Sequence, residues 1–194
     1  DMQVVKVLCL EDISLPDAQA VKDYNEILQD NTIDTVVEAM GGLHPAYEFV
    51  RAAIEAGKNV VTSNKALVAA KGIELNKLAI ENNVSFLFSA ACGGAVPFLH
   101  NLSIAVKSDR ILSLGGILNG TTNYILTKMI DEKQSFDVAL KAAQELGYAE
   151  ADPSADVDGI DTCRKICILA SLCFGTHVYP DGIYTEGISK ITLE

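Results

Sequence analysis

Residues 59–72, NVVTSNKALVAAKG, join a short apolar strand to a longer helical segment through a polar turn. The residues on either side repeat this alternation at short spacing, which is typical of βαβ units around a mostly parallel sheet. We therefore expect an α/β fold, with strands at 4–10, 35–38, 59–62 and 84–88 and helices at 15–30, 45–56 and 65–82, the last broken or bent near Gly72.

The pattern changes after Ser89. Residues 89–96, SAACGGAV, are all small or aliphatic, and they lead into a helix expected from Pro97. We place a domain boundary in this segment. Beyond it, the sequence predicts a strand at 111–118 and helices at 121–132, 135–146 and 157–174. The chain therefore predicts a partial Rossmann-type parallel sheet followed by an α+β domain.

The composition narrows the classes of partner. The 194 residues are 49% hydrophobic, which suits a packed core, and their formal net charge is −11. That charge argues against binding to nucleic acid or to an anionic membrane. The longest uncharged apolar run, 166–174, is too short to span a bilayer, and no secretory signal pattern opens the chain. Five cysteines complete no metal-ligand pattern, so we expect buried thiols in a reducing cytoplasm.

Two polar loops follow expected strands, EAMGG at 38–42 and TSNK at 62–65. In an open α/β sheet, loops at the carboxyl ends of strands line the ligand crevice. Paired glycines let the backbone approach a ligand, and Lys65 at a helix start suits an anion or a polarised carbonyl. The alternatives are an ordinary tight turn at 38–42, and a Ser63 or Asn64 helix cap beside a solvated lysine.

Two further segments offer backbone groups to a ligand. The carbonyls of residues 89–96 suit a hard cation, or the segment is only a hinge between domains. NGTTNY, at 119–124, joins a strand to a helix. The N–H groups at that helix start suit a carboxylate, unless the hydroxyls of the segment simply cap the helix.

The run GYAEADPSADVDGID, at 147–161, carries five carboxylates and is closed by Lys165. Its spacing does not match a calcium loop. Asp158, Asp161 and Lys165 are spaced to share one helix face. An exposed Asp161–Lys165 pair would stabilise the helix by only about 0.3–0.5 kcal/mol. Alternatively, Lys165 is partly desolvated where the helix becomes apolar, and it donates a proton to a developing alkoxide.

The chain resembles homoserine dehydrogenase. The strongest matches are ILNGTTNY at 117–124 and GYAEADP at 147–153, the latter continuing through Asp156, Gly159, Asp161 and Lys165. TSNKA at 62–66 and GGAVP at 93–97 follow the same pattern in the same order. Together these motifs are specific, and the resemblance covers nearly the whole chain. The resemblance implies a partial dinucleotide-binding domain at 1–90 and a partial catalytic domain at 91–194.

The resemblance also implies an activity: the reduction of aspartate 4-semialdehyde to homoserine with NAD(P)H, a step toward threonine and methionine. Lys165 would be the acid–base lysine, and Lys65 would act between the nicotinamide and the substrate. The carboxylates suit the ammonium group of an amino-acid substrate. The implied substrate-binding residues are Thr121, Tyr148, Glu150, Asp156 and Asp161, and the cofactor-binding residues are Met40, Gly41, Gly42, Asn64 and Lys65.

Two binding partners follow from the same resemblance. A sodium-like cation would be held by loop carbonyls that fall on Ser89, Cys92, Gly94 and Val96, although the family pattern has glutamate at the first of these positions. Members of the family commonly form homodimers through the sheet of the catalytic domain. We therefore expect a homodimeric cytoplasmic enzyme with a small amino-acid substrate.

The sequence departs from the family pattern at its ends. The first strand and the glycine-rich G-x-G-x-x-G turn of the family precede residues 1–10, and the family pattern continues beyond Glu194. We therefore expect an internal fragment. Near the end of the first expected strand, Glu11-Asp12 favours the free ribose of NAD over the phosphate of NADP. The alternatives are an inactive fragment that keeps only the substrate pocket, or an unrelated NAD-binding dehydrogenase with an amino-acid pocket.

Overall fold

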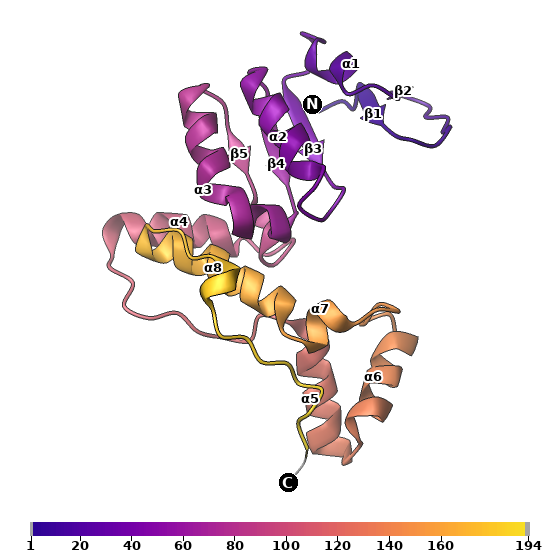
Figure 1. Ribbon diagram of the computed structural model, residues 1–194, viewed down its shortest axis with the longest axis vertical. Coiled ribbons are helices and arrows are strands. Elements are labelled where there is room, and N and C mark those ends of the chain that lie inside the picture. Colours follow the sequence, from indigo (N-terminus) through magenta and orange to yellow (C-terminus); the bar gives the residue numbers. More distant parts are fainter. Residues whose placement is uncertain (1, 193–194) are drawn as a thin grey trace. The chain divides into compact units, whose positions relative to one another are not determined.

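The computed structural model describes residues 2–192, and the chain divides between Ala91 and Cys92 into two compact units (Figure 1). The first unit contains the parallel strands, and the described part of the second is built from helices. The predicted α/β class with a parallel sheet is confirmed. Among residues 2–192, no helix is both long enough and apolar enough to cross a membrane.

The main sheet of the first unit has the order β3-β4-β5, with β3 at Thr35–Glu38, β4 at Asn59–Thr62 and β5 at Phe86–Leu87. All neighbours are parallel, and Glu38 lies opposite Thr62 in the register. Helix α2 (Ala46–Glu55) connects β3 to β4, and α3 (Lys65–Glu81) connects β4 to β5. The carboxyl ends of β3 and β4 therefore lie side by side, followed by the two polar loops.

Burial explains why these segments form strands and helices. The apolar residues of α2 repeat at helical spacing, and Val50, Ala53 and Ile54 are all at most 1% exposed. Val60 of β4 and Leu67 of α3 are fully buried in the same unit. Helix α3 runs unbroken through Gly72, contrary to the break or bend expected there. A single glycine costs a helix only about 1 kcal/mol, and the buried residues on both sides outweigh that cost.

The predicted helix at 15–30 is wrong. Residues Gln19–Val21 form strand β2, which pairs in parallel with β1 (Lys6–Leu8), and only Asn25–Leu28 is helical, as α1. The side chain of Asp23 accepts a hydrogen bond from the backbone N–H of Asn25 at 2.9 Å, which begins the helix only after the strand. Here pairing with a neighbouring strand prevails over local helix propensity.

The second unit contains α4 (Phe98–Ser108), α5 (Gly120–Glu132), α6 (Phe136–Glu145), α7 (Ser154–Val157) and α8 (Ile160–Phe174). The short 3-10 helices η1 (Ser89–Ala91) and η2 (Pro180–Gly182) lie outside them, η1 in the first unit. Helices α5 and α6 pack together around Ile125, Met129 and Ala139, and α4 packs along α8. Figure 1 shows α7 and α8 meeting at a sharp turn beside the start of α5.

Two elements of the second unit differ from the sequence predictions. Residues 111–118 form no strand, because no segment within residues 2–192 pairs with them. The helix expected at 157–174 is interrupted at Gly159, which has a φ of +80°. A Cβ at this position would lie 3.0 Å from the carbonyl oxygen of Glu186, so both the space and the left-handed φ require glycine.

Candidate active site

Glu38 organises the loop that follows β3. Its carboxylate is 4% exposed, and Oε1 accepts hydrogen bonds from the backbone N–H groups of Met40 at 2.7 Å and Gly41 at 3.3 Å. Its other oxygen, Oε2, accepts from the hydroxyl of Thr62 at 2.5 Å. A buried carboxylate is costly unless it is hydrogen-bonded, and here three donors from two loops satisfy it.

Asn64 caps α3 and joins the same two loops. Its Oδ1 accepts from the N–H of Leu67 at 3.1 Å, and its Nδ2 donates to the carbonyl of Gly42 at 2.6 Å. The backbone N–H of Asn64 donates to Thr62 Oγ1 at 2.9 Å. Of the two expected cap residues, Asn64 rather than Ser63 therefore performs the capping.

The expected cofactor-binding residues of the first unit lie together at this edge of the sheet. Gly41 and Gly42 have φ values of +75° and +72°, which glycine adopts without strain. A Cβ built on Gly41 would meet no atom within 4 Å, so open space lies in front of this turn. Met40 is exposed, and Lys65 is half-buried at the first position of α3.

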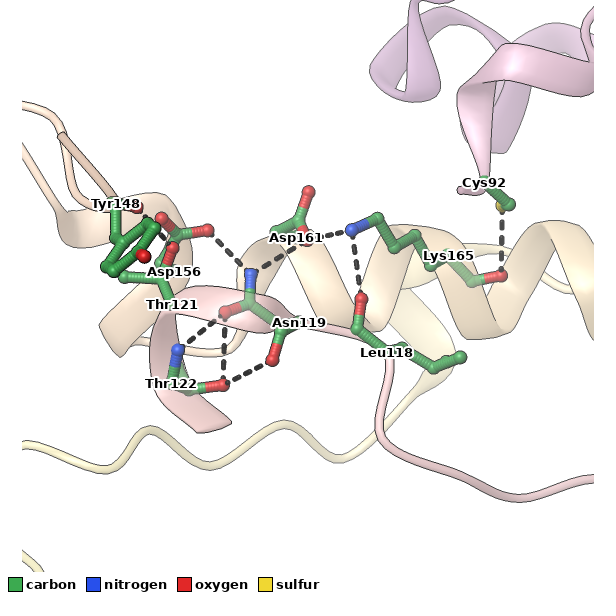
Figure 2. A network of polar contacts seen from close by, with 9 residues as sticks. All are labelled: Cys92, Leu118, Asn119, Thr121, Thr122, Tyr148, Asp156, Asp161 and Lys165. Carbon is green, nitrogen blue, oxygen red and sulfur yellow. Dashed lines mark hydrogen bonds and ion pairs between the residues drawn. The ribbon is translucent and has the colours of Figure 1, made fainter. Parts of the chain in front are cut away.

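A second network brings together Asp156, Asp161 and Lys165 of the second unit (Figure 2). Asn119 is 6% exposed, and its Nδ2 donates to Asp156 Oδ1 at 2.6 Å and to Asp161 Oδ2 at 2.9 Å. Its Oδ1 accepts from the N–H of Thr122 at 2.8 Å, so it also caps α5. The capping group is therefore the Asn119 amide rather than the hydroxyls considered from the sequence.

Lys165 lies on α8 one turn after Asp161. Its Nζ is 2.7 Å from Asp161 Oδ2 and donates to the carbonyl of Leu118 at 2.9 Å. The two side chains are only 19% and 7% exposed, so the pair is not the solvated surface pair considered as an alternative. Asp158, expected on the same helix face, instead terminates α7 and is exposed.

The remaining expected substrate residues lie around the start of α5 and the loop before α7. The hydroxyl of Thr121 donates to the carbonyl of Tyr148 at 2.6 Å, which links the two segments. Tyr148 and Glu150 are themselves exposed. The backbone carbonyl of Glu150 accepts a hydrogen bond from Gln144 at 3.1 Å. Hydrogen bonds from the side chain and backbone of Ser154 lower the pKa of Asp152, so this carboxylate stays charged.

A cavity of about 350 Å³ opens beside this network. Asn119 and Asp156 line it, together with residues 183–188, but among the described residues Lys165 and Asp161 do not. The cavity is therefore lined by Asn119 and Leu118 of the network but not by the Lys165 side chain. We locate the chemistry by the charged groups rather than by this cavity, because its wall at 183–186 is exposed chain.

The expected cation ligands follow one another in a turn-rich segment. Ser89 begins η1, and the N–H of Val96 donates to the carbonyl of Gly93 at 2.9 Å. Gly93 and Ala95 have φ values of +76° and +64°. The thiol of Cys92 is buried and donates weakly to the carbonyl of Lys165 at 3.8 Å. Within residues 2–192, no group of three or more His, Cys, Asp or Glu side chains is arranged to hold a metal.

Sequence reasoning did not single out Glu38, Thr62 or Asn119 as organising residues. A signal was present, because each ends or directly follows an apolar segment. What the sequence does not show is burial: the three side chains are 4%, 1% and 6% exposed. A buried polar side chain has to find partners, which makes it an organiser of its surroundings.

Two family models match the chain, one in each unit. Residues 6–89 match the family model described as the NAD binding domain of homoserine dehydrogenase, and residues 97–194 match the model described as homoserine dehydrogenase. The chain is 47% identical to a homoserine dehydrogenase of Synechocystis, over 93% of this chain and 42% of that protein. It is 43% identical to the enzyme of Lactococcus lactis, over 98% of this chain and 46% of that protein.

Solved structures show the same likeness. A homoserine dehydrogenase from Thiobacillus denitrificans superposes with a TM-score of 0.85 at 45% identity, covering 90% of this chain and 40% of that one. A hyperthermophilic archaeal homoserine dehydrogenase in complex with NADPH gives a TM-score of 0.79 at 31% identity, covering 87% and 52%. The chain spans less than half the length of these two curated relatives. Both units are thus accounted for by one family, and the chain belongs to the homoserine dehydrogenase family.

Proposed function

We propose that the protein carrying this chain interconverts aspartate 4-semialdehyde and homoserine with NAD(P)H, as a step of threonine and methionine biosynthesis. The observation that carries the proposal is the placement of Lys165. An ammonium has three N–H bonds, and two of them point to Asp161 and to the carbonyl of Leu118. We assign the third to the carbonyl oxygen of the substrate.

In this proposal, Lys165 donates the proton that the developing alkoxide takes up. The reduced nicotinamide supplies the hydride. Asp161 holds Lys165 in position, because their contact is short and largely sheltered from water. Lys65 acts beside the reacting groups as the second catalytic lysine, at the start of α3.

The substrate ammonium is assigned to the acidic residues of the second unit. The Asn119 amide donates to Oδ1 of Asp156 and to Oδ2 of Asp161, which brings the two carboxylates to one place. Such a pair of carboxylates suits a substrate ammonium, since charge-assisted hydrogen bonds are the stronger ones. Thr121, Tyr148 and Glu150 complete the proposed pocket, with the first held against the second by a hydrogen bond.

The residues at the ends of β3 and β4 fit a nicotinamide cofactor. They lie at the carboxyl ends of parallel strands, where ligands bind in open α/β sheets. The turn at Met40–Gly42 has open space in front of Gly41, which lets a planar ring approach the backbone. We therefore assign Met40, Gly41, Gly42, Asn64 and Lys65 to cofactor binding.

The test is an assay of the full-length protein with NADH or NADPH and aspartate semialdehyde, following cofactor oxidation. Lys165→Ala should lower kcat by about 10²–10⁴-fold and change KM far less, as expected for a lost proton donor. Lys128→Ala is a matched control, because Lys128 is also a helical lysine paired with a carboxylate four residues away. A rise in KM as large as the fall in kcat would contradict the proposal. So would a fall in kcat that is equal in Lys165→Ala and Lys128→Ala.

An inactive protein that only binds the amino acid is the second candidate, favoured by the polar network of the second unit, whose hydrogen bonds join residues of that unit alone. A nucleotide titration separates the two. The enzyme binds NADH or NADPH saturably, whereas the amino-acid-binding protein binds homoserine alone. Fluorescence of the reduced nicotinamide reports binding without any turnover.

The cation and the dimer belong to the same proposal. Carbonyls of Ser89, Cys92, Gly94 and Val96 are assigned to a sodium-like ion, in a segment that two left-handed residues turn sharply. Replacing sodium with choline should lower activity if the ion is bound. The homodimer is supported by apolar residues exposed at 111–118, of which Leu112 is 81% exposed, and light scattering of the full-length protein tests it. A cytoplasmic location suits the five cysteines, none of which is joined in a disulfide within residues 2–192.

A further inference from the structure

The hydrogen bonds at the ends of β3 and β4 close into a ring. Glu38 accepts from the N–H groups of Met40 and Gly41 on one side and from the hydroxyl of Thr62 on the other. Thr62 accepts in turn from the N–H of Asn64, and Asn64 Nδ2 returns to the carbonyl of Gly42 at 2.6 Å. We call these side chains, Glu38, Thr62 and Asn64, the loop clamp.

The loop clamp fixes both loops through their backbones. Donors of the 40–42 turn are held by Glu38, and the carbonyl at its end is held by Asn64. All three clamp side chains are at most 6% exposed, so water does not compete for these contacts. A turn whose two glycines both adopt positive φ has many alternative conformations in the absence of such contacts.

We propose that Glu38 is a positioning residue for the nicotinamide cofactor, acting through the loop clamp on the Met40–Gly42 turn. This inference rests on the proposed function, because it assigns the turn to cofactor binding. Glu38 itself is buried behind the turn and touches no cofactor in this proposal. Its carboxylate is suited to the role because both of its oxygens accept, whereas an amide offers one acceptor and one donor.

The inference predicts a specific loss in Glu38→Gln. The Gln amide keeps one acceptor for the turn N–H groups but presents a donor to Thr62, whose hydroxyl has to reverse, and the charge that strengthens the contacts on both sides of the ring is lost. We expect the Kd for NADH or NADPH, measured by nicotinamide fluorescence on the full-length protein, to rise about tenfold, which is about 1.4 kcal/mol. The KM for the nucleotide should rise with it, while the KM for aspartate semialdehyde stays at its wild-type value.

Thr62 provides an isosteric pair that tests the same ring. Thr62→Val removes the hydroxyl and keeps the shape, and it should raise the nucleotide Kd about threefold to tenfold. Thr62→Ser keeps the hydroxyl and should restore wild-type binding. This pair also serves if Glu38→Gln fails to fold.

Lys58→Met is the matched control for a purely structural role. Lys58, which directly precedes β4, is also 4% exposed. Its Nζ, however, donates to the carbonyls of Asp30 and Ile33 rather than to either loop of the clamp. It should lower the melting temperature without changing the nucleotide Kd. If Glu38→Gln and Thr62→Val behave like Lys58→Met, Glu38 is only a structural residue and the inference is overturned.

The outcomes also separate this inference from the proposed function. A wild-type protein that binds nucleotide but does not oxidise it with aspartate semialdehyde removes the proposed substrate and leaves the Glu38 comparison intact. A wild-type protein with no saturable NADH or NADPH binding overturns both.

Discussion

The two units use the same side chain for different purposes. Asn64 in the first unit and Asn119 in the second are both 6% exposed, and both cap the helix that follows by accepting a backbone N–H. Their Nδ2 groups differ in what they hold. Asn64 donates to a backbone carbonyl of a loop, whereas Asn119 donates to the carboxylates of Asp156 and Asp161.

This difference gives the two asparagines different roles, since Asn64 positions a backbone turn and Asn119 holds charged side chains. In the first unit the amide fixes the path of a glycine turn, so the backbone itself becomes the proposed binding surface. In the second unit the amide holds two like charges close together, and Lys165 balances one of them. A change at Asn64 should therefore affect geometry, and a change at Asn119 should affect electrostatics.

The largest effect is expected from Asn119→Asp. A third carboxylate would then face Asp156 and Asp161 in a largely buried site, and an uncompensated buried charge is strongly destabilising. We expect the free energy of unfolding to fall by about 3 kcal/mol at neutral pH, measured by urea denaturation of the full-length protein.

Asn64→Asp is the matched substitution. It keeps the cap oxygen and loses the hydrogen bond to Gly42. Its new charge is buried but is stabilised by the helix N-terminus, whereas the charge of Asn119→Asp also faces two neighbouring carboxylates. We expect a smaller loss of about 1–2 kcal/mol. Equal losses in the two variants would show that the two networks do not differ in their sensitivity to charge.

Asp161→Asn is expected to lower the catalytic rate more than the stability of the second unit. The variant keeps an acceptor for Asn119 but loses the charge that faces Lys165 at 2.7 Å. We expect kcat to fall about a hundredfold, or about 2.7 kcal/mol, with a smaller change in the KM for the nucleotide. Steady-state kinetics with both substrates varied measures this.

Asp158→Asn is its control, because Asp158 is an exposed carboxylate only three residues earlier, outside α8. A loss in Asp158→Asn as large as that in Asp161→Asn would mean that net negative charge, rather than the contact with Lys165, supports turnover.

The sequence predicts the fold best where a strand carries its own composition signal. The strands at 35–38 and 59–62 are confirmed at those bounds, because both are rich in β-branched valine and threonine. The helix expected at 15–30 is wrong because Gln19–Val21 has little such signal and is a strand through its pairing with β1. The strand expected at 111–118 has suitable alternation but no pairing partner within the described residues.

The candidate site shows the same limit. Motif spacing indicated Asp161 and Lys165, and one helical turn brings their charged ends together. Spacing could not place Asn119 between Asp156 and Asp161, since Asn119 precedes them in the sequence by 37 and 42 residues, respectively. Nor could it indicate which polar residues are buried, and burial is what makes Glu38 and Asn119 organisers.

A buried thiol two residues after Lys165 on α8 gives the second unit a pH response. Cys167 is fully buried, and burial, with a smaller contribution from Cys163, raises its pKa to about 12. The unfolded chain ionises this thiol near its ordinary value of 9.0, so the stabilisation is complete below that pH and is lost progressively as the pH rises toward 12.

Melting curves between pH 7 and pH 10.5 measure this response. We expect the melting temperature of the wild type to fall by about 2–4 °C more than that of Cys167→Ala over this range. Leu169→Ala, a truncation of a buried side chain on the same helix that removes no titratable group, should keep the wild-type slope. Parallel slopes in all three proteins would assign the alkaline loss to other groups.

The smallest effect is expected at Asp12 and Lys22, where the charge of the side chains would select between NADH and NADPH. Asp12, expected to favour NAD, is paired with Lys22 at 3.0 Å, and Lys22 also donates to the carbonyl of Leu10 at 2.6 Å. Both side chains are well exposed, so each contributes little. We expect Lys22→Met to raise the KM for NADPH about threefold, because the acidic residues then face the ribose phosphate without a neighbouring cation.

Asp12→Asn should shift the ratio of kcat/KM values for NADPH and NADH in the opposite direction by a similar factor. The ratio isolates the phosphate, since NADH and NADPH differ only there. If each variant changes the kcat/KM values for NADH and NADPH equally, the pair at Asp12 and Lys22 orders the loop but does not discriminate between the two nucleotides by the phosphate. If they move the ratio in opposite directions, charge selects the nucleotide at the strand edge, while the loop clamp positions its nicotinamide end.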